Sequence, residues 1–295
     1  MRRLLLLIPT TTYRTEDFLE AASKLGVEVV VASERPSTLE AHAPDTLLTL
    51  DFARPSSAAR AAAEFARRRP IDAVVPVDDL TSVVGATIAA ALGLPANPVA
   101  AVSATRNKHR MREVLRQAGV PGPPYALFTL ADDPEVAARR VAAYPCVLKP
   151  TILAASRGVI RADGPAGFVA AFRRIAAILR EPDVRALGEG SDQILVEGFV
   201  PGREVALEGL LVKGTLAVLA LFDKPDPLDG PFFEETIYVT PSRLPAPVQA
   251  AIAARTAEAA AALGLTDGPI HAELRVNDTG PWLIELATRT IGGLC

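Results

Sequence analysis

Short apolar runs alternate with helical patterns over about the first hundred residues, and this alternation constrains the fold more than any other feature. The runs that predict strands are 3–8, 27–32 and 73–77, and the patterns that predict helices are 16–25, 56–69 and 80–92. Such alternation favours a parallel sheet in a doubly wound α/β unit. The turn after the first strand reads PTTTYRT rather than G-x-G-x-x-G, so a dinucleotide site is not expected there.

The rest of the chain divides into two further units by pattern. A basic helix opens an α+β stretch, and a mostly β stretch with an Ala-rich helix at 246–263 and a final hairpin follows it. A strand is also expected at 235–240. We therefore predict three units, namely residues 1–103 (α/β), 104–190 (α+β) and 191–295 (mostly antiparallel β).

Composition excludes several classes of protein. Hydrophobic residues make up 49% of the 295, and the formal net charge is -3, which predicts a folded protein with no electrostatic preference for nucleic acid or membrane. The opening apolar run ends at Pro9 and is too short for a signal peptide, and no stretch has the length of a membrane span. The two cysteines, Cys146 and Cys295, suit a reducing compartment, so we expect a cytoplasmic location.

Two carboxylates face each other in the predicted C-terminal hairpin. Apolar and polar residues alternate over 271–276, a turn is predicted at 277–281, and the return strand begins at Trp282. This register would place Glu273 opposite Glu285, where like charges destabilise unless a cation, a shared proton or solvent relieves them. One interpretation is a divalent metal held by both carboxylates. The other is a different register with a solvated outer face.

Lysine is rare in this chain, which makes its few positions informative. Only five of the 31 basic residues are lysines, of which Lys108 starts a helix and Lys149 ends an apolar strand. Lys149 can reach a phosphate, and Ser156, Arg157 and Gly158 lie in a loop of mostly small residues whose N–H groups could approach an anion. The alternative is a strand-capping lysine that extends into water beside an ordinary loop.

The motif ILVEGFVPGREVALEG combines a strand exit with two glutamates. A buried strand brings four residues to a turn, and the next strand carries Glu204. The four residues are Glu197, Gly198, Phe199 and Val200. Backbone at a strand exit can read an adenine edge, and a nearby carboxylate can accept hydrogen bonds from ribose hydroxyls. The alternative is a plain hairpin with exposed glutamates.

The final hairpin carries two more candidates. Arg289 follows the second carboxylate by four residues, where it would stabilise the negative charge that develops on a transferred phosphoryl group. The alternative is a surface arginine. His271 begins the hairpin and either borders the phosphates or is a hydrogen-bonded strand histidine.

The order of these features resembles the ATP-grasp superfamily over nearly the whole chain. The order is Lys108, then Lys149 with its small-residue loop, then VEGFVPGRE, then E-x₁₁-E followed by x₃-R. The resemblance implies a pre-ATP-grasp α/β domain followed by an ATP-grasp fold, which consists of a lid subdomain and a mostly antiparallel catalytic subdomain. It implies that Lys108 and Lys149 contact ATP phosphates, that the loop 156–158 closes over them, that 197–200 form the adenine hinge, and that Glu204 holds the ribose.

The resemblance also implies that Glu273 and Glu285 bind Mg²⁺, or Mn²⁺ in its place, while Arg289 steadies the transferred phosphoryl group and His271 borders the phosphates. One departure is that the family usually has Asn two residues after the second metal glutamate, where this chain has Ala287. The lid loop is also less Gly-rich than usual, and relatives often continue further at the C-terminus. One possibility left open by the sequence is therefore that the chain is truncated and that a further segment or a partner chain completes it.

ATP-grasp enzymes phosphorylate a carboxylate and let an amine or thiol displace the phosphate. The resemblance therefore implies a carboxylate–amine ligase that forms an amide or peptide bond through an acylphosphate and releases ADP and phosphate. Two alternatives stay open, a carboxylase or purine-pathway type of ATP-grasp enzyme and an ATP-binding module with little or no turnover. The expected partners are a small-molecule carboxylate and amine, with no nucleic acid and no membrane, and a homodimer is allowed.

The long Pro-rich loop at 222–245 looks like the substrate-facing loop of ligases that join amino acids. Glu234, Glu235 and Arg243 could meet an amine and a carboxylate there. The alternative is a surface loop whose prolines only shape its turns. We expect the substrate to be an amino acid or a related carboxylate.

Overall fold

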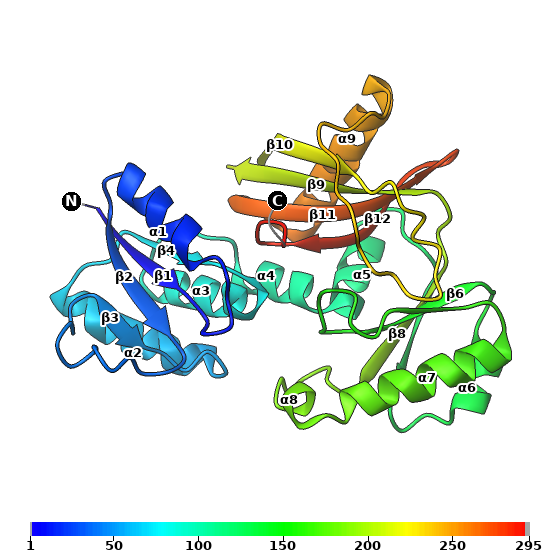
Figure 1. The fold of residues 1–295 in the computed structure, drawn as a ribbon, viewed down its shortest axis with the longest axis horizontal. Helices are drawn as coiled ribbons and strands as arrows, with labels where there is room; N and C mark the ends of the chain where they lie inside the picture. Colours follow the sequence, from blue (N-terminus) through cyan, green and yellow to red (C-terminus); the bar gives the residue numbers. More distant parts are fainter. Residues whose placement is uncertain (1, 293–295) are drawn as a thin grey trace.

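The computed structural model describes residues 2–292. Cys295 and the chain end lie outside the described residues. The described residues form three four-stranded sheets, one in each of the three units (Figure 1). None of the helices in this part of the chain is both long and apolar enough to cross a membrane.

The first sheet is parallel throughout, as the alternation predicts, and has the strand order β3-β2-β1-β4. Its strands are β1 (Arg3–Leu7), β2 (Glu28–Ser33), β3 (Leu47–Thr49) and β4 (Ala73–Pro76). Its helices are α1 (Thr15–Lys24), α2 (Pro55–Arg68) and α3 (Asp79–Ala91). The sequence pattern missed β3 because a three-residue edge strand is too short to show a period.

α3 begins with a capping box that faces the other two units. Asp78 Oδ1 accepts a hydrogen bond from the backbone N–H of Leu80 at 3.0 Å, and the Thr81 hydroxyl lies 3.4 Å from the Asp78 backbone nitrogen. Such a cap satisfies N–H groups that have no partner inside the helix. It thereby fixes the position of the next residue, Asp79.

The second sheet is antiparallel and has the order β5-β8-β6-β7. Its strands are β5 (Tyr125–Thr129), β6 (Cys146–Pro150), β7 (Ile160–Ala162) and β8 (Gln193–Gly198), and its helices are α6 (Pro134–Arg140), α7 (Pro165–Leu179) and α8 (Pro182–Arg185). We expected β8 in the third unit. It pairs instead with β5 and β6, because Ile194 and Val196 complete the core beneath α7.

The third sheet has the order β10-β9-β11-β12 and is also antiparallel. Its strands are β9 (Arg203–Val212), β10 (Thr215–Asp223), β11 (Gly268–Asn277) and β12 (Gly280–Ala287), and α9 (Ala246–Leu263) packs against it. The strand expected at 235–240 is wrong, because within that segment only Val239 pairs, with Asp223. Glu235 and Tyr238 turn toward a cavity instead of alternating along a sheet.

Two helices, α4 (Val99–Arg106) and α5 (Lys108–Gln117), connect the first unit to the other two. Met111 and Leu115 of α5 share a core with Ile270 and Leu283 of the third sheet. The expectation that α5 belongs with the second unit is therefore not met. A basic helix pattern shows which face of a helix is apolar but not which sheet that face covers.

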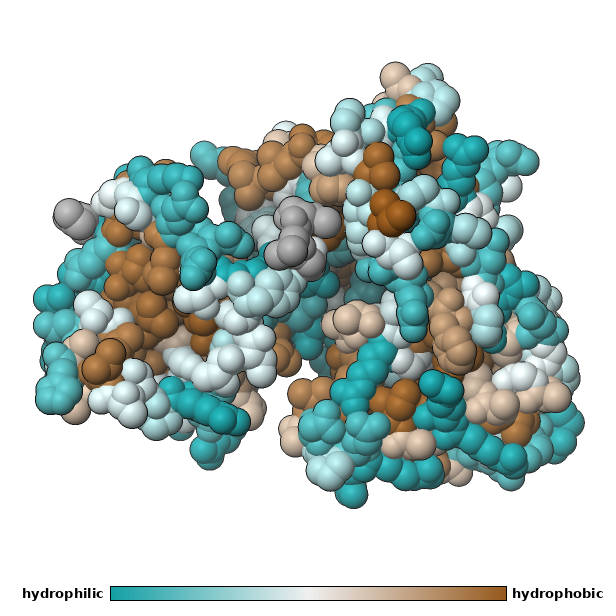
Figure 2. All heavy atoms as spheres, viewed as in Figure 1, coloured by the Kyte–Doolittle hydropathy of each residue, from teal (hydrophilic) through white to brown (hydrophobic). Residues whose placement is uncertain are grey.

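Part of the third sheet exposes hydrophobic side chains. β10 is an edge strand on which Val218 and Leu219 are 46% and 69% exposed, and Val212 at the end of β9 is 52% exposed. Figure 2 shows hydrophobic atoms gathered near the end of β9 and the start of β10, on the side toward the N-terminal unit. An unpaired edge with apolar side chains is a surface suited to association.

The turn between β8 and β9 depends on Gly202. Its φ is +124°, and a Cβ atom there would lie 2.3 Å from the carbonyl oxygen of Val276 in β11. We expect Gly202→Ala to lower the free energy of unfolding by roughly 2–5 kcal/mol, because an unfavourable φ and a backbone clash act together. Gly214→Ala is a matched control, since its φ is +78° but nothing lies within 4 Å of the added Cβ. Chemical denaturation of both variants tests this, and equal losses would contradict it.

Candidate active site

A cavity of about 840 Å³ lies where the three units meet. The N-terminal unit contributes residues 11–14 and 77–80, the second unit contributes Lys149 and residues 153–156, and the third unit contributes β11, β12 and the chain that follows. Residues 11–14 and 77–80 follow the carboxyl ends of β1 and β4, which is where open parallel sheets generally bind ligands. The cavity is therefore the candidate active site.

Glu273 lies directly opposite Glu285, as the sequence predicts, but the hairpin reaches this register by another route. The turn is shorter than expected, so Val276 pairs with Pro281 rather than with Trp282. A bulge between Glu273 and its strand neighbour then restores the predicted opposition. Both carboxylates line the cavity, so the alternative of a solvated outer face is not what the structure contains.

Different cations neutralise the two opposed carboxylates. The ammonium of Lys108 lies 3.1 Å from Glu285 Oε1 and donates to the carbonyl oxygen of Leu153 at 2.8 Å. Glu273 Oε1 lies 3.2 Å from the ammonium of Lys224 and 3.4 Å from His271 Nε2. Each carboxylate is thus neutralised by its own cation, which lowers the electrostatic repulsion between the two opposed glutamates.

Lys224 is a site residue that the sequence analysis missed. Its ammonium is buried among three carboxylates, 2.9 Å from Glu204, 3.2 Å from Glu273, and hydrogen-bonded to Glu235. These three carboxylates lie close enough together to hold a metal ion, yet the ammonium already lies among them. Burial lowers the pKa of Lys224, but the carboxylates outweigh it and raise the pKa above its ordinary value. The only sequence signal was the rarity of lysine.

His271 is held between two glutamates on the face of β11 that lines the cavity. Its Nδ1 lies 2.5 Å from Glu208 Oε1, while Glu208 Oε2 accepts a hydrogen bond from the backbone N–H of Ile291 at 2.9 Å. Burial lowers the pKa of the imidazole, but hydrogen bonds to Glu208 and Glu273 raise it to about 9. His271 is therefore a buried, positively charged strand histidine that also lines the cavity.

Glu197 carries a buried charge rather than facing solvent. Its carboxylate pairs with Arg112 and lies 2.6 Å from the ammonium of Lys149. Burial raises the pKa of Glu197, but Arg112 and Lys149 outweigh it and lower the pKa to about 2. The alternatives of an exposed glutamate and of a lysine extending into water are both wrong, since both residues are buried.

The strand exit after Glu197 lines the cavity. The backbone N–H of Gly198 donates to the carbonyl of Pro124 at 2.9 Å, and that of Phe199 donates to the carbonyl of Pro145 at 3.0 Å. The Phe199 ring lies between two guanidinium groups, with Arg161 4.2 Å and Arg275 5.0 Å from the ring centroid. These contacts fix the exit, and they include two arginines that local sequence patterns did not single out.

Arg275 also fixes the carboxylate of Glu204, which lines the cavity. Arg275 Nε donates to Glu204 Oε2 at 3.0 Å, and the backbone carbonyl of Val200, which also lines the cavity, accepts a hydrogen bond from Arg275 Nη1 at 3.0 Å. Glu204 is therefore held between Arg275 and Lys224.

The small-residue loop contributes to the cavity in part. Ala155 and Ser156 have φ angles of +53° each, and Ser156 lines the cavity. Arg157 turns away and pairs with Asp183 at 3.2 Å and with Glu181. Neither Arg157 nor Gly158 is among the residues that line the cavity. A Cβ at Gly158 would lie 2.9 Å from Pro150, so this glycine serves close packing of the loop.

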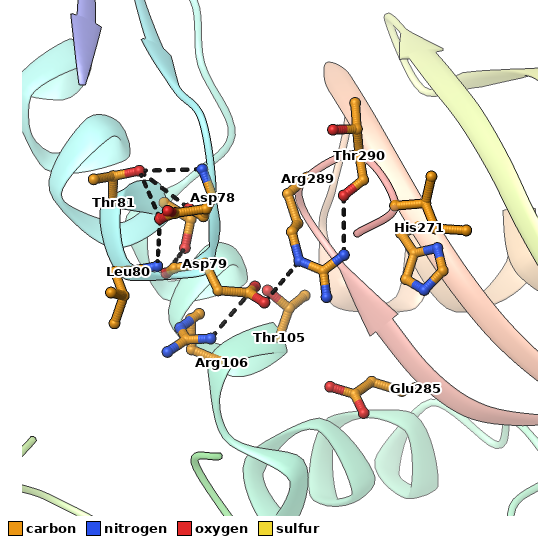
Figure 3. Close-up of polar contacts among 12 residues, drawn as sticks. Asp78, Asp79, Leu80, Thr81, Thr105, Arg106, His271, Glu285, Arg289 and Thr290 are labelled. Atoms are coloured by element: carbon orange, nitrogen blue, oxygen red, sulfur yellow. Dashed lines mark hydrogen bonds and ion pairs between the residues drawn. The ribbon is translucent and has the colours of Figure 1, made fainter. Parts of the chain in front are cut away.

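Arg289 is bound by a residue of the first unit. Its Nε donates to Asp79 Oδ2 at 2.7 Å, and its Nη1 donates to the carbonyl of Thr290 at 2.9 Å (Figure 3). Asp79 Oδ1 lies 3.3 Å from Arg106. Arg289 lines the cavity and is not a surface arginine. Asp79 is 210 residues away in the sequence, so no local pattern could have identified this pair.

Only one of the three candidate residues on the Pro-rich loop lines the cavity. Glu235 lines the cavity, and its carboxylate also accepts a hydrogen bond from the Tyr238 hydroxyl. Glu234 and Arg243 do not line the cavity. Arg243 lies 3.3 Å from Asp223 instead. The structure thus brings one of the three to the site.

Two family models match this chain. The model described as the ATP-grasp domain matches residues 142–295, and the model described as the ATP-grasp N-terminal domain matches residues 19–96. The first alone covers more than half of the chain.

The chain is also similar to individual proteins that are named as ligases or synthases. The chain is 28% identical over 214 residues to alanine–anticapsin ligase of Bacillus subtilis strain 168, covering 68% of this chain and 44% of that protein. It is 30% identical over 289 residues to carnosine synthase 1 of Gallus gallus, covering 93% of this chain and 31% of that protein. The chain therefore spans less than half the length of these relatives. Among solved structures, an L-amino acid ligase from Bacillus licheniformis superposes with a TM-score of 0.78 at 27% identity, covering 99% of this chain and 68% of that chain.

The buried charge of Glu197 predicts a pH-dependent loss of stability. Glu197→Gln should lower the free energy of unfolding by roughly 3–5 kcal/mol near neutral pH, because it leaves Lys149 and Arg112 without their shared partner. The folded-state pKa of about 2 lies below the ordinary value of 4.5. The stabilisation is therefore fully present above about pH 4.5 and is lost as the pH falls toward 2.

Urea denaturation of both proteins from pH 7 to pH 2 measures this difference, which should shrink between pH 4.5 and pH 2. Glu64→Gln is the control, because Glu64 pairs with Arg67 at 2.7 Å on the exposed face of α2. Its effect should stay within about 1 kcal/mol. A difference for Glu197→Gln that does not depend on pH would show that the pKa of Glu197 is the same in the folded and the unfolded protein, and would contradict the prediction.

Proposed function

We propose that this chain, which belongs to the ATP-grasp family, catalyses the ATP-dependent joining of a carboxylate to an amine through an acylphosphate. One observation carries the proposal: a single cavity gathers Lys108, Lys149, Arg289 and the opposed pair Glu273 and Glu285. Phosphoryl transfer requires mainly positioned positive charge and a metal-binding carboxylate pair, and this cavity offers both.

ATP fits the chemistry of the residues on the two sides of the cavity. We assign the adenine to the strand exit at 197–200 and the ribose hydroxyls to Glu204. The phosphates would extend toward Lys149 and Lys108, whose ammonium groups are buried and therefore interact strongly with anions. Ser156 lies beside them in a loop whose backbone could close over the phosphates.

The charge of the cavity favours a metal ion together with the nucleotide. Seven carboxylates line it, against five lysine or arginine side chains and His271. Lys224 and Arg112 also pair with carboxylates of this cavity. A polyphosphate therefore enters a site whose positive groups are mostly already paired with carboxylates, and it needs further cations to accompany it.

The opposed Glu273 and Glu285 are oxygen ligands that suit Mg²⁺. The side chain of Ala287 offers no ligand atom, so Glu273 and Glu285 are the residues that we assign to the metal. When bound, the metal would neutralise charge on the phosphate oxygens.

The reaction that these residues support has two steps. An oxygen of the substrate carboxylate attacks the γ-phosphorus, and the bond from that phosphorus to the ADP oxygen breaks. The amine nitrogen then attacks the acyl carbon, phosphate leaves with the bonding electrons, and the nitrogen loses a proton. Arg289 and Lys149 would stabilise the negative charge on the phosphoryl group in transit. The loops that carry Ser156 and Glu235 would exclude water and so protect the acylphosphate from hydrolysis.

The substrates that we propose are amino acids. Two of the similar proteins, alanine–anticapsin ligase and the L-amino acid ligase, are named for amino acids. The cavity also continues beyond the phosphate side to the N-terminal unit. Glu235 and Tyr238 lie on the cavity wall, where a carboxylate could receive an ammonium group. A cytoplasmic location, where ATP is plentiful, remains part of the proposal.

Assembly as a homodimer also remains part of the proposal. The exposed apolar residues of edge strand β10 support it, since Leu219 is 69% exposed. Sedimentation velocity of the protein over a range of concentrations would detect the dimer.

Product analysis tests the ligase proposal. Purified protein is incubated with ATP, Mg²⁺, pooled amino acids and hydroxylamine, which traps an acylphosphate as a hydroxamate. We expect ADP, phosphate and hydroxamate only when certain amino acids are present. AMP and pyrophosphate would rule out the mechanism. Saturable MgADP binding without turnover would instead favour the binding module.

Lys149→Gln should weaken MgADP binding about 10- to 100-fold, because it removes a charge-assisted contact to phosphate. Lys213→Gln is the matched control, since Lys213 lies in the exposed turn between β9 and β10 and does not line the cavity. Isothermal titration gives both affinities, and circular dichroism checks that each variant is folded. Equal affinity of the two variants would remove Lys149 from the nucleotide site.

A further inference from the structure

We propose that Asp79 is a positioning residue that orients the guanidinium of Arg289 for phosphoryl transfer, acting from the N-terminal unit across the cavity. The inference rests on the proposed function. It adds a residue that neither the sequence motifs nor the family resemblance identified.

Asp79 is held rigidly and has its two oxygens engaged separately. It is the first residue of α3, directly after the capping residue Asp78. Its Oδ2 accepts from Arg289 Nε at 2.7 Å, and its Oδ1 lies 3.3 Å from Arg106 Nη1. Burial raises the pKa of Asp79, but Arg289 and Arg106 outweigh it and hold the pKa below its ordinary value. The carboxylate is therefore an ionised, fixed acceptor.

Arg289 needs such an acceptor because no regular strand holds it. β12 ends at Ala287, and Arg289 lies in the irregular chain that follows. Asp79 binds Nε, and the carbonyl of Thr290 binds Nη1 at 2.9 Å. Figure 3 shows the third nitrogen pointing toward the side of the site where Glu285 lies. A planar guanidinium with two nitrogens fixed presents the third in a single direction.

Orientation of this kind affects rate more than binding. A misplacement of about 1 Å in a catalytic group can cost about 100-fold in rate. Asp79 belongs to the first unit and Arg289 to the third, so the guanidinium takes this orientation only when the two units are docked. A purely structural salt bridge would also join the units, but Asp79 would then act equally through Arg106, which does not line the cavity.

The test is a mutant cycle on the rate of ADP formation. Asp79→Asn and Asp79→Ala should lower kcat about 10- to 100-fold, with less than 3-fold change in the KM for ATP. In the Arg289→Gln background, Asp79→Asn should add less than about 2-fold, because its target is already gone. Arg106→Gln is the comparison: it removes a group that holds Asp79 but leaves the contact of Asp79 with Arg289, so its loss of kcat should be clearly smaller than that of Asp79→Asn.

A second readout does not require a known amino-acid substrate. MgADP with aluminium fluoride mimics the transferred phosphoryl group, and its affinity should fall about 10-fold or more in Asp79→Asn, while the affinity for MgADP alone stays within about 2-fold. Unchanged MgADP affinity also shows that the variant is folded.

The outcomes separate the two proposals. A rise in kcat in Asp79→Asn would mean that Asp79 restrains Arg289, and equal losses in Asp79→Asn and Arg106→Gln would mean a structural bridge. Additive losses in the double variant, or an unchanged affinity for MgADP with aluminium fluoride, would equally overturn the positioning role. Failure of the wild-type protein to bind MgADP would instead overturn the proposed function on which it rests.

Discussion

One buried carboxylate, that of Glu197, determines how the site is assembled. Its charge must be neutralised inside the protein, and the two cations that do so come from different units: Lys149 from β6 and Arg112 from α5. Arg112 also donates to the carbonyl oxygen of Ile284 at 2.7 Å, within the bulge of β12. Because that bulge brings the two hairpin glutamates opposite each other, the contacts that allow Glu197 to be buried also hold the register of the proposed metal site. The same set of contacts thus supports both the phosphate side and the metal side of the cavity.

The remaining charges of the site are also paired before any ligand binds. Lys224, His271 and Lys108 each bind a cavity carboxylate, and each is itself held by a second protein group. Side chains fixed in this way need little reorganisation when charge develops during a reaction, which is the main electrostatic advantage of an enzyme over water. The same arrangement explains why so many like charges can lie together in a buried space.

Local patterns were sufficient for much of the fold and for part of the site. Period-two alternation correctly predicted that Glu273 opposes Glu285. It did not predict the compensating bulge, where the carbonyl of Ile284 accepts a hydrogen bond from Arg112 on a distant helix. The family resemblance is confirmed by the family models, and the α/β and antiparallel sheets are as expected. The predictions that were wrong or incomplete concern features that depend on long-range packing. The sheet that β8 joins is determined by its partners in space, and the roles of Lys224 and Asp79 come from partners up to 210 residues away.

The position of α5 restricts how the second and third units can move relative to each other, because the helix packs on the third sheet and is hydrogen-bonded to the second unit. Its core side chains belong to the third unit, while the backbone N–H of Lys108 donates to the carbonyl of Thr151 at 2.8 Å, and Arg112 pairs with Glu197. Residues four apart lie on the same face of a helix, so the two attachments form a line nearly parallel to its axis. A rotation of the second unit that preserves these two contacts must therefore have that line as its axis. The Lys149 ammonium, bonded to Glu197 beside that line, would hardly move. The contact from the Lys108 ammonium to the carbonyl of Leu153 would have to break before the small-residue loop could follow such a rotation.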